Sequence, residues 1–273
     1  MIDNFEQILA EMKKAAEQYD NQKYKCDYCK DSGWVKTSTD EEGNEFYGEC
    51  PYCGLIDKLR RNSSLKFANI PEIYQKNKLE DFKTTIYTTK ENQQKASEIM
   101  RIATYWLDNL AEQQKVGRGL YLYSHDKGSG KTFLITAIAN HLLSTGHEVK
   151  FATSIDIINE IKNTWERKNR PENTEKEGVL LKQLSECEIL IIDDFGTEKV
   201  KDWISERFYA IINTRYNNRK ITCYTSNVAL KDLDYDERIT SRLKSTVYSV
   251  EFPSEDIRTL IGRKAHMDLY SKE

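Results

Sequence analysis

The sequence predicts an α/β fold, in which helices cover a mainly parallel sheet that is preceded by a small cysteine-rich module. Three observations carry this prediction. A short apolar strand leads through a glycine-containing loop into an apolar helix between residues 119 and 143, and a second apolar strand at residues 189–192 ends in two acidic residues. Two Cys-x-x-Cys pairs lie nearer the N-terminus than either strand.

Composition limits the class of protein. The 273 residues are enough for one large domain and one small one, and 38% apolar against 31% charged residues is typical of a polar globular protein. The net charge of −3 excludes a general basic field, so any contact with nucleic acid must come from local patches. No run of 18 apolar residues occurs, and the first residues are charged and amphipathic. We therefore expect a cytoplasmic protein without a membrane span or signal peptide.

The first 21 residues predict an amphipathic helix. Apolar side chains recur at helical spacing from Ile2 to Tyr19, which places them in one stripe. Two interpretations remain open: the stripe packs on the following module, or it binds a partner.

Residues 22–62 contain the two cysteine pairs, which consist of Cys26, Cys29, Cys50 and Cys53. Four thiolates from two such turns make a tetrahedral zinc site, and four protein ligands leave no open position for catalysis. Two short segments flank a turn-rich stretch between the pairs, which predicts a β-hairpin and hence a zinc-ribbon-like module. A redox dithiol or free thiols are the alternatives, but neither pair lies in the strand–helix pattern of a redox motif. Because so small a module has little apolar core, we expect zinc to hold it folded.

Residues 63–95 are expected to link this module to the main domain, which spans residues 96–273. Short turns at residues 70–74 and 79–82 would anchor the linker. The broad apolar face of residues 92–113 predicts a helix.

The segment at residues 119–132 begins as a buried strand, Leu120–Tyr123, and ends at the start of an apolar helix. A loop between a strand and a helix N-terminus aims backbone N–H groups at one point, which favours a phosphate. We expect ATP to be held by Lys127, Gly128, Ser129, Gly130, Lys131 and Thr132. The glycines let the backbone approach the phosphates, Lys131 supplies charge to the β/γ oxygens, and the Thr132 hydroxyl can ligate Mg²⁺.

The loop departs from the pattern Gly-x-x-x-x-Gly-Lys-Thr at its first position, which is His125. His125 must adopt an unusual φ or bend the loop differently, because glycine normally eases the exit from the strand. An ordinary Gly/Ser turn with an incidental lysine is the alternative, and the position of the loop between strand and helix disfavours it. Upstream of the loop, Leu79 and Phe82 either contact a bound adenine or only cap the core.

Strands and helices alternate along the rest of the chain. Further strands are predicted at residues 149–153, 189–192, 220–225 and 247–252, and helices at 154–161, 203–216, 236–243 and after 252. Between the first two strands the helical pattern breaks into a charged loop at residues 164–173. Arg167, Lys168 and Arg170 lie there beside Trp165, so the loop either contacts single-stranded nucleic acid or is only solvated.

Polar residues follow two of these strands. Asp193 and Asp194 end one apolar strand, and Asn227 follows the next strand along the chain. Ligands of parallel sheets bind at the carboxyl ends of the strands, where the phosphate loop also lies. Asp193 can therefore hold Mg²⁺, and Asp194 can orient or deprotonate the attacking water. Asn227 either positions this water beside the γ-phosphate or caps its strand.

Together these segments resemble an AAA+ ATPase core over residues 96–273. The motifs that match its Walker A, Walker B, sensor 1 and arginine-finger positions are Gly128–Thr132, Ile191–Asp194, Thr225–Asn227 and Arg238-x-x-x-Arg242. The short C-terminal tail does not fit the helical lid domain of that family. A lidless core with Asp-Asp-Phe-Gly behind a Cys-x-x-Cys module is similar to bacterial or phage helicase loaders of the DnaC and DnaI type. The same clade includes transposon-helper ATPases of the IstB type.

The resemblance implies a five-stranded parallel sheet and an Mg²⁺-dependent ATPase that self-associates through its ATP site. It implies that Arg242 reaches the ATP of a neighbouring subunit, with Arg238 as its rival for that role. Loaders of this type bind a hexameric replicative DNA helicase through the N-terminal domain and help place it on single-stranded DNA.

Three functions remain open. The first is the helicase loader. The second is an IstB-type helper that assembles on duplex DNA, which the zinc module disfavours. The third is a non-catalytic adaptor whose nucleotide only stabilises the fold, which the two acidic residues and Asn227 disfavour.

Overall fold

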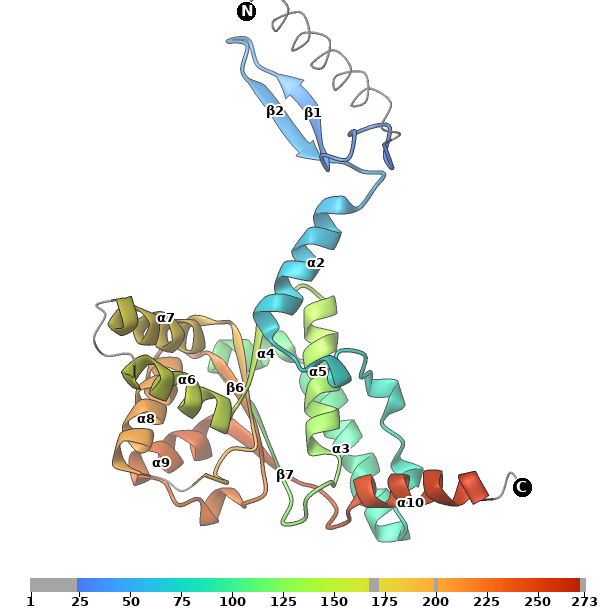
Figure 1. Cartoon of the computed structure of the whole chain (residues 1–273), viewed down its shortest axis with the longest axis vertical. Coiled ribbons are helices and arrows are strands. Elements are labelled where there is room, and N and C mark those ends of the chain that lie inside the picture. Colours follow the sequence, from blue (N-terminus) through green and yellow to red (C-terminus); the bar gives the residue numbers. More distant parts are fainter. Residues whose placement is uncertain (1–23, 167–171, 199–200, 271–273) are drawn as a thin grey trace, which may run out of the picture. The chain divides into compact units, whose positions relative to one another are not determined.

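The computed structural model describes residues 24–166, 172–198 and 201–270 of the chain (Figure 1). The chain divides into two units, Met1–Ser63 and Ser64–Glu273. The helix predicted at residues 1–21 lies outside the described residues. Within the described part of the chain, no helix is long and apolar enough to cross a membrane.

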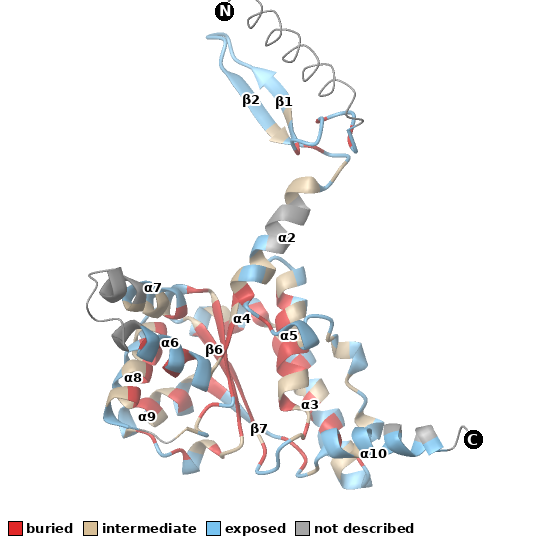
Figure 2. Cartoon of the chain, viewed as in Figure 1, coloured by how far each residue is buried: buried red, intermediate tan, exposed pale blue. Residues whose placement is uncertain are grey.

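The first unit contains the predicted hairpin, formed by the antiparallel strands β1 (Trp34–Thr39) and β2 (Glu45–Glu49). The Asp40 carboxylate closes its turn by accepting from the backbone N–H groups of Glu42 and Asn44, at 3.0 and 2.8 Å. The hairpin buries almost nothing, and the small core of the unit consists of the cysteine cluster with Val35 packed against it (Figure 2). The helix α2 (Leu55–Ala68) follows, at a place where no helix was predicted.

The second unit is built on a sheet whose five strands all run parallel, as predicted. Its order is β4-β5-β6-β3-β7. The strands are β3 (Gly119–Tyr123), β4 (Val149–Thr153), β5 (Ile189–Asp193), β6 (Ile221–Ser226) and β7 (Val247–Glu251). Thr153 pairs with Asp193 and Tyr123 pairs with Ser226, so the carboxyl ends of four strands lie along one edge.

Helices cover both faces of this sheet (Figure 1). They are α3 (Lys90–Asp108), α4 (Leu110–Val116), α5 (Lys131–Ser144), α6 (Ser154–Glu166), α7 (Glu172–Glu186), α8 (Asp202–Asn217), α9 (Glu237–Thr246) and α10 (Ile257–Tyr270). Short 3₁₀ turns occur at Glu72–Tyr74, Leu79–Asp81, Thr84–Ile86 and Leu230–Asp232.

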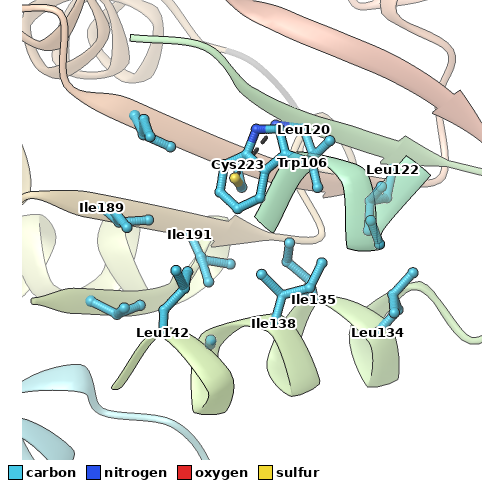
Figure 3. Packing of buried hydrophobic residues seen from close by; sticks show 14 of the residues in the cluster. Trp106, Leu120, Leu122, Leu134, Ile135, Ile138, Leu142, Ile189, Ile191 and Cys223 are labelled. Carbon is cyan, nitrogen blue, oxygen red and sulfur yellow. Dashed lines mark hydrogen bonds between the residues drawn. The ribbon is translucent and has the colours of Figure 1, made fainter. Parts of the chain in front are cut away.

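The two faces of the sheet bury two separate apolar clusters, because successive side chains of a strand point to opposite faces. Ile191 packs with α3 and α5, whereas its neighbour Ile192 packs with α6, α8 and α9. Figure 3 shows the first cluster, where Leu134, Ile138 and Leu142 of α5 lie under the strands. Both faces of β5 are buried, which explains its unbroken apolar run.

Three predictions about helices need correction. The helix predicted at residues 92–113 is interrupted at Asn109, which separates α3 from α4. The loop predicted at residues 164–173 is wrong at both ends, because α6 continues to Glu166 and α7 begins at Glu172. Its basic residues Arg167, Lys168 and Arg170 lie outside the described part. The helix α7 was not predicted, although its Leu184 is fully buried against the neighbouring helices.

Candidate nucleotide site and metal centre

The loop between β3 and α5 lies at the carboxyl edge of the sheet. Gly128 and Gly130 have φ angles of 74° and 97°, a left-handed conformation that favours glycine. A Cβ atom on Gly128 would lie 2.1 Å from Asp256 Oδ1, so a side chain there would force the Asp256 carboxylate to move. His125 has no positive φ, and its ring packs edge-on against Tyr123 at 6.5 Å between centroids. The replacement of the first loop glycine therefore needs no unusual φ.

Lys131 is buried at the base of this loop, with 5% of its surface exposed. Its ammonium group donates to the carbonyl of Asp126 at 3.2 Å and to the Ser129 hydroxyl at 3.1 Å. Burial lowers the pKa of Lys131, and the carboxylates of Asp194 and Asp193 act in the opposite direction. The charge is thus held against the loop by neutral acceptors, which a phosphate oxygen could replace.

Asp193 ends β5 beside this loop and is 5% exposed. The Thr132 hydroxyl lies 3.1 Å from Asp193 Oδ1, and the Thr225 hydroxyl from the adjacent strand donates to the same oxygen. Burial raises the pKa of Asp193 to about 6, and the charge of Asp194 adds to that shift. A bound cation would favour the ionised form. The two oxygens of Thr132 and Asp193 are hard donors of the kind that Mg²⁺ prefers.

A cleft of about 630 Å³ opens over the loop. Lys127–Thr132, Asp194 and Asn227 line it, so the structure brings together most of the residues that the sequence singled out. Phe82 also lines the cleft, whereas Leu79 packs against the core.

The other walls of the cleft were not predicted. They come from Ile73, Tyr74, Asp81, Lys83, Ile86, Tyr87, Phe133, Thr197, Ile257, Arg258 and Ile261. The Tyr87 hydroxyl donates to the carbonyl of Ser129 at 2.8 Å, which ties the linker to the phosphate loop. The one available signal was the concentration of apolar and aromatic residues within the otherwise polar linker at residues 70–87.

Arg238 and Arg242 lie on α9 and do not line the cleft of their own chain. Arg242 donates to the Asn213 side chain at 2.9 Å and to the carbonyl of Arg238 at 2.7 Å, and it stacks on the Tyr209 ring. Arg238 pairs with Asp236 at 2.9 Å and is more exposed. The role of either arginine at the nucleotide of another subunit stays a prediction.

The four cysteines of the first unit lie within 4.8 Å of one another through their sulfur atoms. Cys26 Sγ is 3.8 Å from Cys50 Sγ, and Cys29 Sγ is 3.6 Å from Cys53 Sγ. A tetrahedral zinc ion with Zn–S bonds of about 2.3 Å needs sulfur atoms about 3.8 Å apart. This cluster beside a small hairpin is zinc-ribbon-like, and its geometry suggests a Zn²⁺ site.

A family model described as IstB-like ATP binding protein matches residues 57–243. The chain belongs to this family. This IstB-like protein is also similar to the replicative helicase loader DnaC of Buchnera aphidicola, with 30% identity over 45% of the chain and 50% of the loader. The chain thus spans about half the length of that curated relative. It is 23% identical to the phage-like element PBSX protein XkdC of Bacillus subtilis, over 87% of the chain and 88% of XkdC.

Among solved structures, a crystal structure of DnaI resembles the IstB-like chain with a TM-score of 0.54 and 24% identity, over 68% of the chain and 95% of DnaI. This likeness concerns the fold. The second unit is therefore an AAA+ core with a five-stranded parallel sheet, and the protein is a member of an ATP-binding family that is related to the DnaC and DnaI helicase loaders.

Proposed function

We propose that this protein is an ATP-hydrolysing helicase loader. The observation that carries the ATPase part is the cleft that Lys131, Thr132, Asp194 and Asn227 line together, with Asp193 bonded to Thr132. The loader part is supported by the sequence similarity to DnaC and by the four-cysteine module ahead of the core.

Five residues at the phosphate loop and the strand ends have roles in this hydrolysis. Thr132 and Asp193 would hold Mg²⁺, which supplies positive charge to the phosphate oxygens. Lys131 binds the β/γ oxygens, and the side-chain amide of Asn227 orients a water molecule. Asp194 accepts a proton from this water, whose oxygen bonds to the γ-phosphorus while the bond to the bridging oxygen breaks and ADP leaves.

The reaction is completed by a neighbouring subunit. Arg242 of that subunit would place its positive charge on the transferring phosphoryl group, and Arg238 is the rival candidate. An arginine supplied in trans can accelerate hydrolysis by roughly 10³–10⁵. Hydrolysis therefore depends on self-association through the ATP site.

The partner is a hexameric replicative DNA helicase, which binds through the zinc-stabilised module and is placed on single-stranded DNA. Direct DNA contact is weak and comes from local basic patches, since the net charge is −3. A protein with four zinc-bound thiolates suits the reducing cytoplasm, where these events occur.

Size-exclusion chromatography with light scattering tests this proposal. The full chain is mixed with the replicative helicase of its own host, with and without ATP, and a stable co-eluting complex is expected. Lys131→Ala should abolish the response to ATP, Cys50→Ser should abolish binding, and Lys95→Ala, a change at an exposed residue of α3, should alter neither.

An IstB-type transposition helper is the second candidate, because the matching family model is described as IstB-like. A chain that ignores the helicase but forms large assemblies on duplex DNA with ATP would favour this function over the loader.

A further inference from the structure

The buried hydroxyl group of Thr225 contacts both acidic residues of the proposed hydrolysis site. Thr225 lies on β6, next to β5, and none of its surface is exposed. The backbone N–H of Asp194 donates to Thr225 Oγ1 at 3.0 Å, and the same hydroxyl donates to Asp193 Oδ1. A hydroxyl carries one proton. One of its two lone pairs receives the Asp194 N–H, and its proton goes to the Asp193 carboxylate, which accepts hydrogen bonds and in its ionised form cannot donate them.

The backbone of Asp194 is held by hydrogen bonds on both sides. Its φ of 54° lies in the left-handed region, which residues with a side chain adopt uncommonly, although aspartate does so more readily than most. Thr225 binds its N–H, while the hydroxyls of Ser154 and Thr197 lie 3.0 and 2.9 Å from its carbonyl oxygen. The Ser154 hydroxyl also lies 2.8 Å from Glu198 Oε2, so it divides its one proton between two acceptors. Thr225 and Thr197 therefore hold the two sides of this backbone, and the Asp194 side chain remains at the cleft.

Thr225 holds Asp194 through the backbone, whereas it holds Asp193 through the side-chain carboxylate. Two hydroxyl groups, those of Thr132 and Thr225, are bonded to this carboxylate. When the Thr132 oxygen serves as a Mg²⁺ ligand, Thr225 is the hydroxyl that continues to orient the carboxylate. Groups that orient a metal ligand in this way typically contribute about 10–100-fold to metal affinity or activity.

We propose that Thr225 is a positioning residue for ATP hydrolysis, which aims the Asp193 carboxylate at Mg²⁺ and holds Asp194 in the backbone conformation that presents its carboxylate to water. This inference rests on the proposed ATPase function. In this proposal the Thr225 hydroxyl sets the distance between the Mg²⁺ ion held by Asp193 and the carboxylate of Asp194, which acts as the base.

The test compares Thr225→Val, which keeps the shape and β-branching but removes the hydroxyl, with Thr225→Ser, which keeps the hydroxyl. Binding of a fluorescent ATP derivative is titrated with Mg²⁺, and hydrolysis is measured on the assembled protein. Thr225→Val should raise the Mg²⁺ concentration at half-saturation about 10–100-fold and lower kcat, with nearly unchanged nucleotide affinity at saturating Mg²⁺. Thr225→Ser should keep the wild-type values of both the half-saturating Mg²⁺ concentration and kcat.

Thr222→Val is the matched control. Thr222 is buried on the same strand, and its hydroxyl accepts from Arg215 Nε at 2.8 Å, away from the cleft. This variant should melt at a lower temperature but keep the wild-type Mg²⁺ dependence. Should Thr225→Val not fold, Thr225→Cys takes its place with the same expected shift, because a thiol is a weak hydrogen-bonding group.

The inference is overturned if Thr225→Val keeps the wild-type Mg²⁺ dependence, or if Thr222→Val shifts it equally. Nucleotide binding by the wild-type protein that does not depend on Mg²⁺ would also overturn it. A wild-type protein that binds ATP with Mg²⁺ but does not hydrolyse it would contradict the proposed ATPase function, while the Mg²⁺ titration would still decide the role of Thr225.

Discussion

At the scale of single residues, Arg215 is an unusual buried charge. It is 1% exposed, and burial lowers the pKa of its guanidinium group. Its partners are the carbonyl groups of Leu184, Cys187 and Ile221 and the hydroxyl of Thr222, at 2.6 to 2.9 Å. The carbonyl of Leu184 belongs to the last turn of α7, where the helix dipole favours a positive charge. Arg215 thus ties α7 and β6 together through neutral oxygens.

We expect Arg215→Met to lower the free energy of unfolding by about 3 kcal/mol, because it leaves several buried oxygens without donors. Urea unfolding measures the change. Arg101→Met is the control, since Arg101 forms an exposed pair with Glu98 whose loss should cost less than about 0.5 kcal/mol. Equal effects of the two substitutions would refute this account of Arg215.

At the same scale, ATP binding is expected to require a glycine at position 128. Gly128→Ala adds a Cβ that collides with Asp256, the residue whose carboxylate accepts from Thr259 N at the start of α10. We expect it to weaken ATP binding by at least tenfold, measured by fluorescence titration. Gly146→Ala also forces a side chain onto a left-handed residue, but meets no atom within 4 Å. It should reduce stability and leave ATP affinity unchanged; a similar loss of affinity in both would contradict the steric explanation.

At the scale of elements, the first unit depends on its cysteine turns. The hairpin of β1 and β2 buries little of its apolar surface, and two-stranded hairpins are marginally stable alone. Tyr28 and Tyr52, one in each Cys-x-x-Cys turn, pack edge-on with ring centroids 4.8 Å apart. The ring pair therefore reports whether the two turns are held together.

Removal of zinc with a chelator should unfold residues 22–58 and abolish helicase binding. The reason is that the zinc–thiolate bonds supply the stability that a hydrophobic core gives to a larger domain. The near-UV circular dichroism of the tyrosine pair should fall, while ATP binding by the core persists. Re-addition of zinc should restore the signal. Helicase binding that survives complete zinc removal would show that the module docks without its metal.

At the scale of the whole molecule, the ATP cleft and the arginines of α9 occupy different places in one chain. Arg242 is bonded to Asn213 and Arg238, and neither arginine lines the cleft. An isolated chain is therefore expected to bind ATP but to hydrolyse it slowly.

Complementation between two inactive variants tests the arrangement. Lys131→Ala removes the ATP site and keeps the arginine, whereas Arg242→Ala keeps ATP binding and removes the arginine. Each alone should be nearly inactive, and their mixture should regain hydrolysis because one subunit supplies what the other lacks. ATPase assays over a range of mixing ratios measure this. An active Arg242→Ala protein, together with an inactive Arg238→Ala protein that recovers hydrolysis when mixed with Lys131→Ala, would transfer the role to Arg238.

The sequence by itself determined the parts that depend on local spacing. The strand–loop–helix pattern around Lys131, the apolar run before Asp193 and the two cysteine pairs each act through residues that are close in the chain. Backbone geometry then places their side chains, so these elements and the parallel sheet could be predicted.

Tertiary structure alone decided what depends on distant contacts. The helix α7 has a charged sequence, and its stability comes from burial of Leu184 against its neighbours. The linker and α10 form walls of the cleft only because Tyr87 and the backbone of Ile257 bond to the phosphate loop. The hydroxyl of Thr225 meets both acidic residues because β6 pairs with β5. Such contacts join residues that are far apart in sequence, so local spacing and apolar periodicity do not predict them.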